Sequence, residues 1–350
     1  MRLQNVTETR DEYLALELAE AAAVFTRDVL RLAPGQQVLI TSDGRSDMRV
    51  VHAVARAVTA GGGVALMLHH GATATAGRRP PPVVAAAAKA ADVWVALSWN
   101  SFVYSDEWKA AVDGGTQYVS YEGLDVDGFV RCVGGVDAPR LAQMGEIVIG
   151  LLDGAEIAVT SEAGTELRFD NRGGKMGAFA MIANAAAIPV MLAGQVTWEP
   201  REASMTGRLV ADGILSPPEE VGLIAEPVTF TVEAGRITAI DGGREATLLR
   251  RWLDGLDDAD MTRIAHASIG FNPGVPVPTG RILEDERAFG DLDFGWGAWV
   301  GRPAAGHFDF TCRQVSLSAD GVEILRAGRY VHPELAALCA EMGVPGHAPA

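Results

Sequence analysis

Two residues near the C-terminal end of the sequence, His307 and Asp309 in the segment GHFDF, have the types and the spacing of metal ligands. Side chains two positions apart on an extended segment project to the same face, so an imidazole and a carboxylate would converge on one point. The His-x-Asp pattern alone has low specificity, because it also arises by chance on half-buried strands. Five other histidines have no second ligand at an informative spacing, and we expect them to be structural or solvated: His52, His69, His70, His332 and His347.

The composition limits the partners and the compartment. A formal net charge of −16 at pH 7 disfavours nucleic acid, whose binding requires clustered Lys and Arg. The apolar runs are too short to cross a membrane, and the N-terminal segment interleaves acidic with apolar residues, so we expect no membrane partner and no signal peptide. Cys132, Cys312 and Cys339 lie far apart, which fits a reducing, cytoplasmic compartment.

Short apolar runs alternate with helical patterns in the first part of the chain. The runs are QQVLITSD, GVALMLHH, ADVWVALSW and QYVSYEG. This alternation predicts βαβ units around a mostly parallel sheet, and we assign residues 1–145 to an α/β domain. No glycine-rich phosphate-binding pattern follows any of the runs, so a nucleotide-binding role has little support.

The second part of the chain, residues 146–350, is rich in strand patterns with close turn signals. Segments such as AEIAVTSEAGTELRF and VTFTVEAGRITAIDGG place Ala-Gly or Gly-Gly pairs between or beside alternating runs, as hairpins require. The segment EATLLRRWLDGL has the pattern of a helix. We therefore expect an α+β domain here, and this domain carries the clustered metal-type ligands.

A long stretch of this second domain resembles a known family. The segments IAHASIGFNPGVPVPTGRILEDERAFGDLDFGWG, GHFDF and GVEILRAGRYV are similar to the C-terminal domain of the thermophilic metallo-aminopeptidases, the aminopeptidase T family. They resemble still more closely its branch of 2,5-dihydroxypyridine 5,6-dioxygenases. The resemblance covers most of residues 145–335 and implies an aminopeptidase T-like fold, a homo-oligomer and a small-molecule substrate.

The peptidase pattern expects two metal ions bridged by carboxylates, and this sequence departs from it. Where the pattern has Gly-Glu-Val, the chain has Gly194-Gln195-Val196; a second Glu position is His266, and a later His position is Asp293. The neutral Gln195 and the imidazole of His266 remove negative charge that two adjacent divalent ions need. A metal-dependent aminopeptidase or hydrolase is therefore the alternative function.

The dioxygenase pattern expects a histidine at the position of His266 together with the His-x-Asp pair, and all three residues are present. Two histidines and one carboxylate form the facial triad of non-haem iron(II) oxygenases, which leaves positions open for substrate and dioxygen. The resemblance thus implies Fe(2+) held by His266, His307 and Asp309. It also implies an extradiol-type dioxygenase that opens a hydroxylated N-heteroaromatic ring in aromatic compound catabolism. The alternative for His266 alone is a core histidine near a turn.

The dioxygenases also place a catalytic histidine in a loop of the α/β half, where this chain has SWNSFVYSDEW without a histidine. Tyr104, Asn100 or Ser101 could handle protons in its place. The alternative is that this aromatic-rich loop only packs. The departure leaves the exact substrate open.

Several neighbours of the ligands have two interpretations. Trp296 and Trp299 could form the wall of an aromatic pocket or belong to the core. The run Glu284 to Glu286 is typical of a solvated turn, or could supply a partner for a ligand imidazole, and Asp293 is expected beside the site or on the surface. A third functional class, a catalytically inactive relative that binds a small molecule or a partner, stays open.

Overall fold

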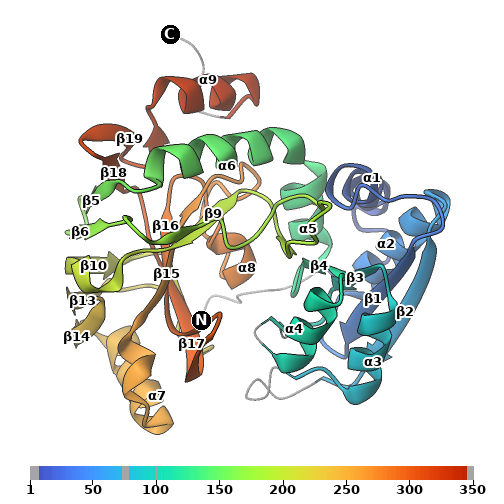
Figure 1. Ribbon diagram of the computed structural model, residues 1–350, viewed down its shortest axis with the longest axis horizontal. Coiled ribbons are helices and arrows are strands. Elements are labelled where there is room, and N and C mark those ends of the chain that lie inside the picture. Colours follow the sequence, from blue (N-terminus) through green and yellow to red (C-terminus); the bar gives the residue numbers. More distant parts are fainter. Residues whose placement is uncertain (1–7, 73–78, 100, 104, 345–350) are drawn as a thin grey trace. The chain divides into compact units, whose positions relative to one another are not determined.

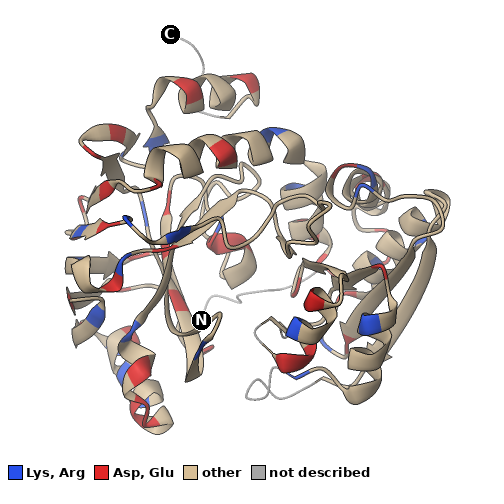
Figure 2. Cartoon of the chain, in the orientation of Figure 1, with Lys and Arg blue, Asp and Glu red and all other residues tan. Residues whose placement is uncertain are grey.

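The computed structural model describes residues 8–72, 79–99, 101–103 and 105–344. The chain divides into two compact units, which we call unit 1 (Met1–Ala142 and Phe179–Ala193) and unit 2 (Gln143–Ala178 and Gly194–Ala350). Acidic side chains outnumber basic ones by 45 to 29. Figure 2 shows both kinds interspersed on the helices and strands of the two units.

Unit 1 is built around a five-stranded sheet, sheet A, with the strand order β2-β1-β3-β4-β8 (Figure 1). Every neighbouring pair in it is parallel, so the expected parallel sheet is confirmed. Its strands are β1 (Gln37–Asp43), β2 (Val64–His70), β3 (Val93–Ala96), β4 (Gln117–Ser120) and β8 (Val190–Met191). The first four match the apolar runs of the sequence.

Helices make the connections that parallel strands require. The helices here are α1 (Ala15–Val24), α2 (Met48–Ala60), α3 (Pro82–Ala90), α4 (Asp106–Asp113) and α5 (Val126–Phe129), of which α2, α3 and α4 connect successive strands of sheet A. Side chains cap three of these helices at the N-terminus: the Asp47 carboxylate accepts the N–H of Arg49 at α2, the Ser105 hydroxyl accepts the N–H of Trp108 at α4, and the Asp125 carboxylate accepts the N–H of Gly128 at α5. The helix α6 (Ala138–Leu152) carries the chain from unit 1 into unit 2.

Unit 2 contains two large sheets that are antiparallel throughout. Sheet B has the order β14-β13-β10-β6-β5-β18-β19-β20, and its strands are β5 (Glu156–Thr160), β6 (Glu166–Asp170), β10 (Thr206–Ala211), β13 (Val228–Glu233), β14 (Arg236–Asp241), β18 (Ser316–Ala319), β19 (Val322–Arg326) and β20 (Arg329–Tyr330). Sheet C has the order β12-β11-β17-β16-β15-β9-β7, and its strands are β7 (Lys175–Met176), β9 (Gln195–Glu199), β11 (Ile214–Ser216), β12 (Gly222–Leu223), β15 (Ile264–Gly270), β16 (Leu292–Trp299) and β17 (Arg302–Cys312). The helices of this unit are α7 (Arg244–Leu256), α8 (Ile282–Asp285) and α9 (Pro333–Glu341).

Sheet C has one apolar and one polar face, because side chains alternate along each strand. Phe294 of β16 and Phe308 and Phe310 of β17 are wholly buried. The ring of Phe310 stacks on Phe230 of β13 with centroids 4.2 Å apart, so the apolar face of sheet C packs on sheet B. The other face of β15, β16 and β17 carries the candidate metal ligands.

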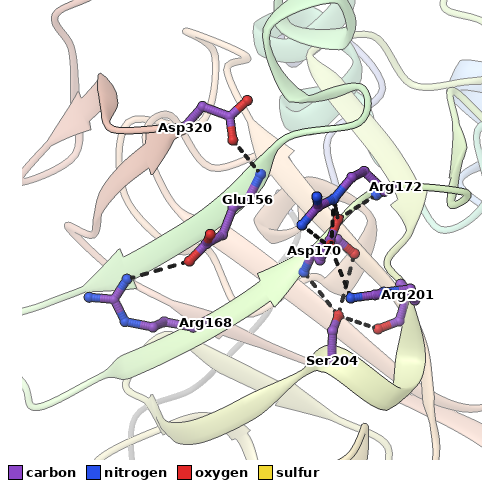
Figure 3. A network of polar contacts seen from close by, with 7 residues as sticks. All are labelled: Glu156, Arg168, Asp170, Arg172, Arg201, Ser204 and Asp320. Carbon is purple, nitrogen blue, oxygen red and sulfur yellow. Dashed lines mark hydrogen bonds and ion pairs between the residues drawn. The ribbon is translucent and has the colours of Figure 1, made fainter.

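A buried carboxylate, Asp170 at the end of β6, joins two segments of unit 2 (Figure 3). Its Oδ2 accepts hydrogen bonds from Arg172 Nε at 2.8 Å and from Arg201 Nη2 at 2.9 Å, and its backbone N–H donates to Ser204 Oγ at 2.9 Å. The hydrogen bonds from Arg172, more than those from any other group, lower the pKa of Asp170 to about 2. Asp170 therefore stays ionised and holds the β6 end and the 201–204 turn together.

We predict that Asp170→Asn lowers the midpoint of thermal unfolding at neutral pH. The folded pKa of about 2 lies below the ordinary 3.8, so the contribution of Asp170 is complete above pH 3.8 and is lost as the pH falls toward 2. Calorimetry across this range should show the difference between variant and wild type shrinking as the pH falls. Glu156→Gln, which removes the exposed 3.9 Å pair with Arg168 in Figure 3, is the control and should change little. A pH-independent difference for Asp170→Asn would contradict this account.

Candidate metal centre

Three neighbouring strands of sheet C bring His266, His307 and Asp309 to one place. In the strand register His266 of β15 lies opposite Gly295 of β16, and Gly295 lies opposite Asp309 of β17. His307 precedes Asp309 by two residues on β17 and therefore shares its face. The residue spacing within β17 and the antiparallel register together determine the cluster.

The ligand atoms of the three residues are close enough to share one ion. Among the described residues these three form a group whose potential ligand atoms all lie within 4.8 Å of one another. The Nε2 atoms of His307 and His266 lie 2.9 Å and 3.3 Å from Asp309 Oδ1. All three side chains are buried, so an ion held there would be largely shielded from bulk water.

The second nitrogen of each imidazole contacts a group on the far side of its ring. His307 Nδ1 donates to the backbone oxygen of Ala298 at 2.7 Å. His266 Nδ1 lies 3.2 Å from Ser268 Oγ, and that hydroxyl donates to Thr197 Oγ1 at 3.1 Å, so it is placed to accept from His266. Both rings therefore have Nδ1 protonated and Nε2 directed at Asp309, which is the arrangement of metal-binding histidines with outer hydrogen-bond partners.

The charges of the cluster suit a cation. Burial raises the pKa of Asp309, but the neighbouring imidazoles, first His307 and then His266, outweigh it and bring the pKa below its ordinary value. Burial lowers the pKa of His266, against the opposite effect of Asp309. At neutral pH the site thus offers an ionised carboxylate and an unprotonated imidazole, which are the forms that bind metal.

Gly295 leaves room for an ion between the ligands. A Cβ at this position would lie 2.2 Å from His266 Nε2 and 2.7 Å from Asp309 Oδ1. A side chain there would occupy the point on which the ligand atoms converge. Two imidazoles, one carboxylate and this gap fit a mononuclear iron(II) centre of the facial-triad type.

The two tryptophans near the ligands have different roles. Trp296 is wholly buried and stacks on Phe310 with centroids 6.1 Å apart, so it belongs to the core between the sheets. Trp299 lies beside the ligands instead, with its ring 4.7 Å from His266 and 6.5 Å from His307. Its Nε1 donates to Glu199 Oε1 at 2.6 Å, which fixes the indole as one wall of the site.

The acidic run after Arg281 is not a solvated turn. Glu284 and Asp285 are wholly buried in α8, where Glu284 pairs with Arg281 and Asp285 accepts the N–H of Thr279. Glu286 pairs with Arg287 at 2.9 Å; burial first, and the charge of Asp309 in addition, raise the pKa of Glu286 to about 7. The sequence predicted an exposed turn because runs of acidic residues are usually hydrated. In the fold, tertiary packing buries Glu284 and Asp285 instead.

Asp293 is also wholly buried. Of its two expected places, beside the site or on the surface, the structure gives the first. Its Oδ2 lies 3.8 Å from His266 Nδ1, on the side of the ring away from Asp309. Burial first, and then the charges of Asp309 and Glu286, raise the pKa of Asp293 well above its ordinary value. This carboxyl group is therefore a neighbour of the ligand cluster and not a member of it.

The expected proton-handling residues belong to unit 1. Ser101 lies after β3, and its Oγ accepts the N–H of Val103 at 3.2 Å. Asn100 and Tyr104 lie outside the described residues. The sequence reasoning missed Glu122, a buried carboxylate beyond the end of β4 that accepts hydrogen bonds from Tyr118 Oη at 2.7 Å and from Ser120 Oγ.

Burial is the largest effect on Glu122 and raises its pKa, while hydrogen bonds from Ser120, Tyr118 and Ser101 oppose that rise. Ser101 is thus joined to a buried carboxyl group that can exchange protons with it. The sequence signal was a lone Glu directly after an apolar strand, which is too common to single out.

Comparison with protein families extends these observations to most of the chain. The family model of 2,5-dihydroxypyridine 5,6-dioxygenase matches residues 23–332, which include most of both units and all three candidate ligands. The chain belongs to this family.

Known members and structures agree with that placement. A 2,5-dihydroxypyridine 5,6-dioxygenase of Pseudomonas putida KT2440 is 32% identical over 152 residues, which are 39% of this chain and 43% of the relative. The aligned stretch thus spans less than half of that relative.

Two solved structures share the fold. The 2,5-dihydroxypyridine dioxygenase of Pseudomonas putida KT2440 has a TM-score of 0.76 at 20% identity, covering 94% of this chain and 99% of the other. AmpT from Thermus thermophilus has a TM-score of 0.64 at 15% identity, covering 91% and 100%. Within the described residues, no helix has the length and apolar character to cross a bilayer.

We predict that Gly295→Ala abolishes metal binding while the protein stays folded. The added methyl group would enter the space between His266 Nε2 and Asp309 Oδ1, and these side-chain ends can move aside only by leaving the ligand geometry. Calorimetric titration of metal-free protein with ferrous ion under nitrogen measures the effect, and circular dichroism checks the fold. Gly255→Ala in α7 is the control, since a Cβ there meets nothing within 4 Å. Wild-type affinity in Gly295→Ala would refute this location for the ion.

Proposed function

We propose that this protein is a non-haem iron(II)-dependent dioxygenase that cleaves a hydroxylated N-heteroaromatic ring, of which 2,5-dihydroxypyridine is the prototype. The observation that carries the proposal is the convergence of two imidazoles and one carboxylate within 4.8 Å in a chain of this family. When bound, the iron supplies the redox chemistry that lets dioxygen react with an electron-rich ring.

The residues of unit 2 would hold and orient the reacting groups. His266, His307 and Asp309 would hold the ion, and such a ligand set leaves coordination positions for substrate and dioxygen. Trp299, held by Glu199, presents an indole ring beside the imidazoles. An aromatic substrate would pack against such a wall, because stacked rings attract beyond their apolar contact.

Ser101 is our proposed proton-handling residue, and Asn100 and Tyr104 remain the further candidates from the same stretch of sequence. Ring opening requires removal of a hydroxyl proton from the substrate and its return to the product. The hydrogen bond between Ser101 and Glu122 gives the hydroxyl a buried carboxyl group with which to exchange that proton. Such a base would take the role of the catalytic histidine that the family resemblance implies for this stretch of sequence.

The alternative function is a metal-dependent aminopeptidase or other hydrolase, which the fold shared with AmpT supports. Metal-activated water would then attack an amide carbonyl at the same ligands. Gln195, a half-buried amide in β9, is a neutral group where a bridging carboxylate would be needed for a second ion. The dioxygenase is therefore the better supported function.

We predict that the iron-loaded protein consumes dioxygen when 2,5-dihydroxypyridine is added. With isotopically labelled dioxygen, mass spectrometry should find both oxygen atoms in the ring-opened product. His307→Ala should show only background uptake because a ligand is lost. Ser101→Ala should retain its iron but turn over about a hundredfold more slowly. Release of amino acids from peptides without oxygen uptake would favour the hydrolase instead.

A further inference from the structure

Asp293 is a buried acid, and no hydrogen bond of its side chain explains why it is buried. The side chain has no exposed surface, and neither carboxyl oxygen has a hydrogen-bond partner among the described residues. A polar group buried without a partner costs free energy of folding, and an acidic group costs most. A group that destabilises the fold in this way calls for a role outside folding.

The surroundings of Asp293 direct it toward His266. In the strand register it lies opposite Ser268 on one side and Thr311 on the other. The Thr311 hydroxyl oxygen already accepts the N–H of Ile214, and the Ser268 hydroxyl donates to Thr197. The cation nearest in sequence, Arg287, donates to Leu283 and Glu286.

The imidazole of His266 offers an N–H donor within reach of Asp293. Its Nδ1 lies 3.8 Å from Asp293 Oδ2 and 3.2 Å from Ser268 Oγ, so it can turn from the hydroxyl toward the carboxyl group by a small rotation of the ring. The same ring directs Nε2 toward Asp309, at 3.3 Å. If the His266 ring moves so that Nε2 binds an ion, the carboxyl group of Asp293 is therefore in position to accept the Nδ1–H.

We propose that Asp293 is a positioning residue for His266, which accepts its Nδ1–H when a metal ion is bound and so fixes the ring and strengthens Nε2 as a ligand. The inference rests on the proposed metal centre. Partners of this kind raise the basicity of an imidazole ligand, and their loss weakens metal binding by about 10- to 100-fold. Asp293 therefore raises metal affinity at the expense of the stability of the metal-free fold.

Asp291 provides a matched control on the same stretch of chain. It is likewise a buried aspartate, but its Oδ1 accepts the N–H of Gln314 at 3.0 Å and its Oδ2 lies 3.8 Å from Arg313. Asp291 has a hydrogen-bond partner and an ion-pair partner in the fold, and neither is a metal ligand. It separates the general effect of neutralising a buried acid from the specific effect on His266.

The test is a titration of metal-free wild type, Asp293→Asn and Asp291→Asn with ferrous ion under nitrogen, together with thermal unfolding of each metal-free protein. We expect Asp293→Asn to bind iron about 10- to 100-fold more weakly while its metal-free unfolding midpoint is unchanged or higher. Asp291→Asn should keep its affinity and unfold at a lower temperature. The visible spectrum of the cobalt(II) form should shift in Asp293→Asn alone, since only there does the ligand field of His266 change.

Equal affinity of Asp293→Asn and wild type would overturn the inference and leave the metal centre intact. A lower unfolding midpoint together with weaker binding would also overturn it, because Asp293 would then be a structural residue. Absence of iron binding in wild type would refute the metal centre itself. Asp293→Ala should show the same weaker binding and carries the test if the Asn variant is not obtained folded.

Discussion

The register of three antiparallel strands is the constraint on which the candidate centre depends. His266, Gly295 and Asp309 lie opposite one another on β15, β16 and β17. A shift of one residue in either pairing would turn a ligand to the apolar face, because side chains alternate along a strand. The stacking of Phe310 on Phe230 between the sheets makes such a shift costly, so packing of the core also fixes the geometry of the ligands.

The polar face of sheet C places several ionisable groups in a small buried volume. Asp309 has two imidazoles as partners, whereas Asp293 has no hydrogen bond and Glu286 depends on Arg287. Mutual repulsion among the three carboxyl groups contributes to the raised pKa values of Asp293 and Glu286. A bound cation would relieve this repulsion, and its binding energy would offset part of the cost of burying the acids. Sites of function are where proteins accept such a cost.

Features that follow from a regular spacing of residues along the chain could be predicted from the sequence. The parallel strands of unit 1 follow from apolar runs, and the convergence of His307 and Asp309 follows from their spacing of two on an extended segment. His266 lies 41 positions before His307, and a separation of that length contains no geometric information. Its assignment came from family resemblance, and the strand register supplied the geometry.

Other features depended on tertiary packing, which local patterns do not encode. The burial of Glu284, Asp285 and Asp293 is set by neighbours distant in sequence, so an acidic run looked solvated. Trp296 stacks on Phe310 in the core whereas Trp299 lies beside His266, and these contacts come from strands that the sequence pattern did not pair. The strand β8 has two residues and no detectable pattern, and it pairs with β4 only because the chain returns to unit 1.

The most direct test of the central claim is elemental analysis of protein purified without air, comparing wild type with Asp309→Ala. The account predicts about one iron per wild-type chain and none in the variant, as a single facial triad requires. Two zinc or cobalt ions per chain would contradict it and favour a dinuclear hydrolase, and iron retained in Asp309→Ala would place the ion elsewhere.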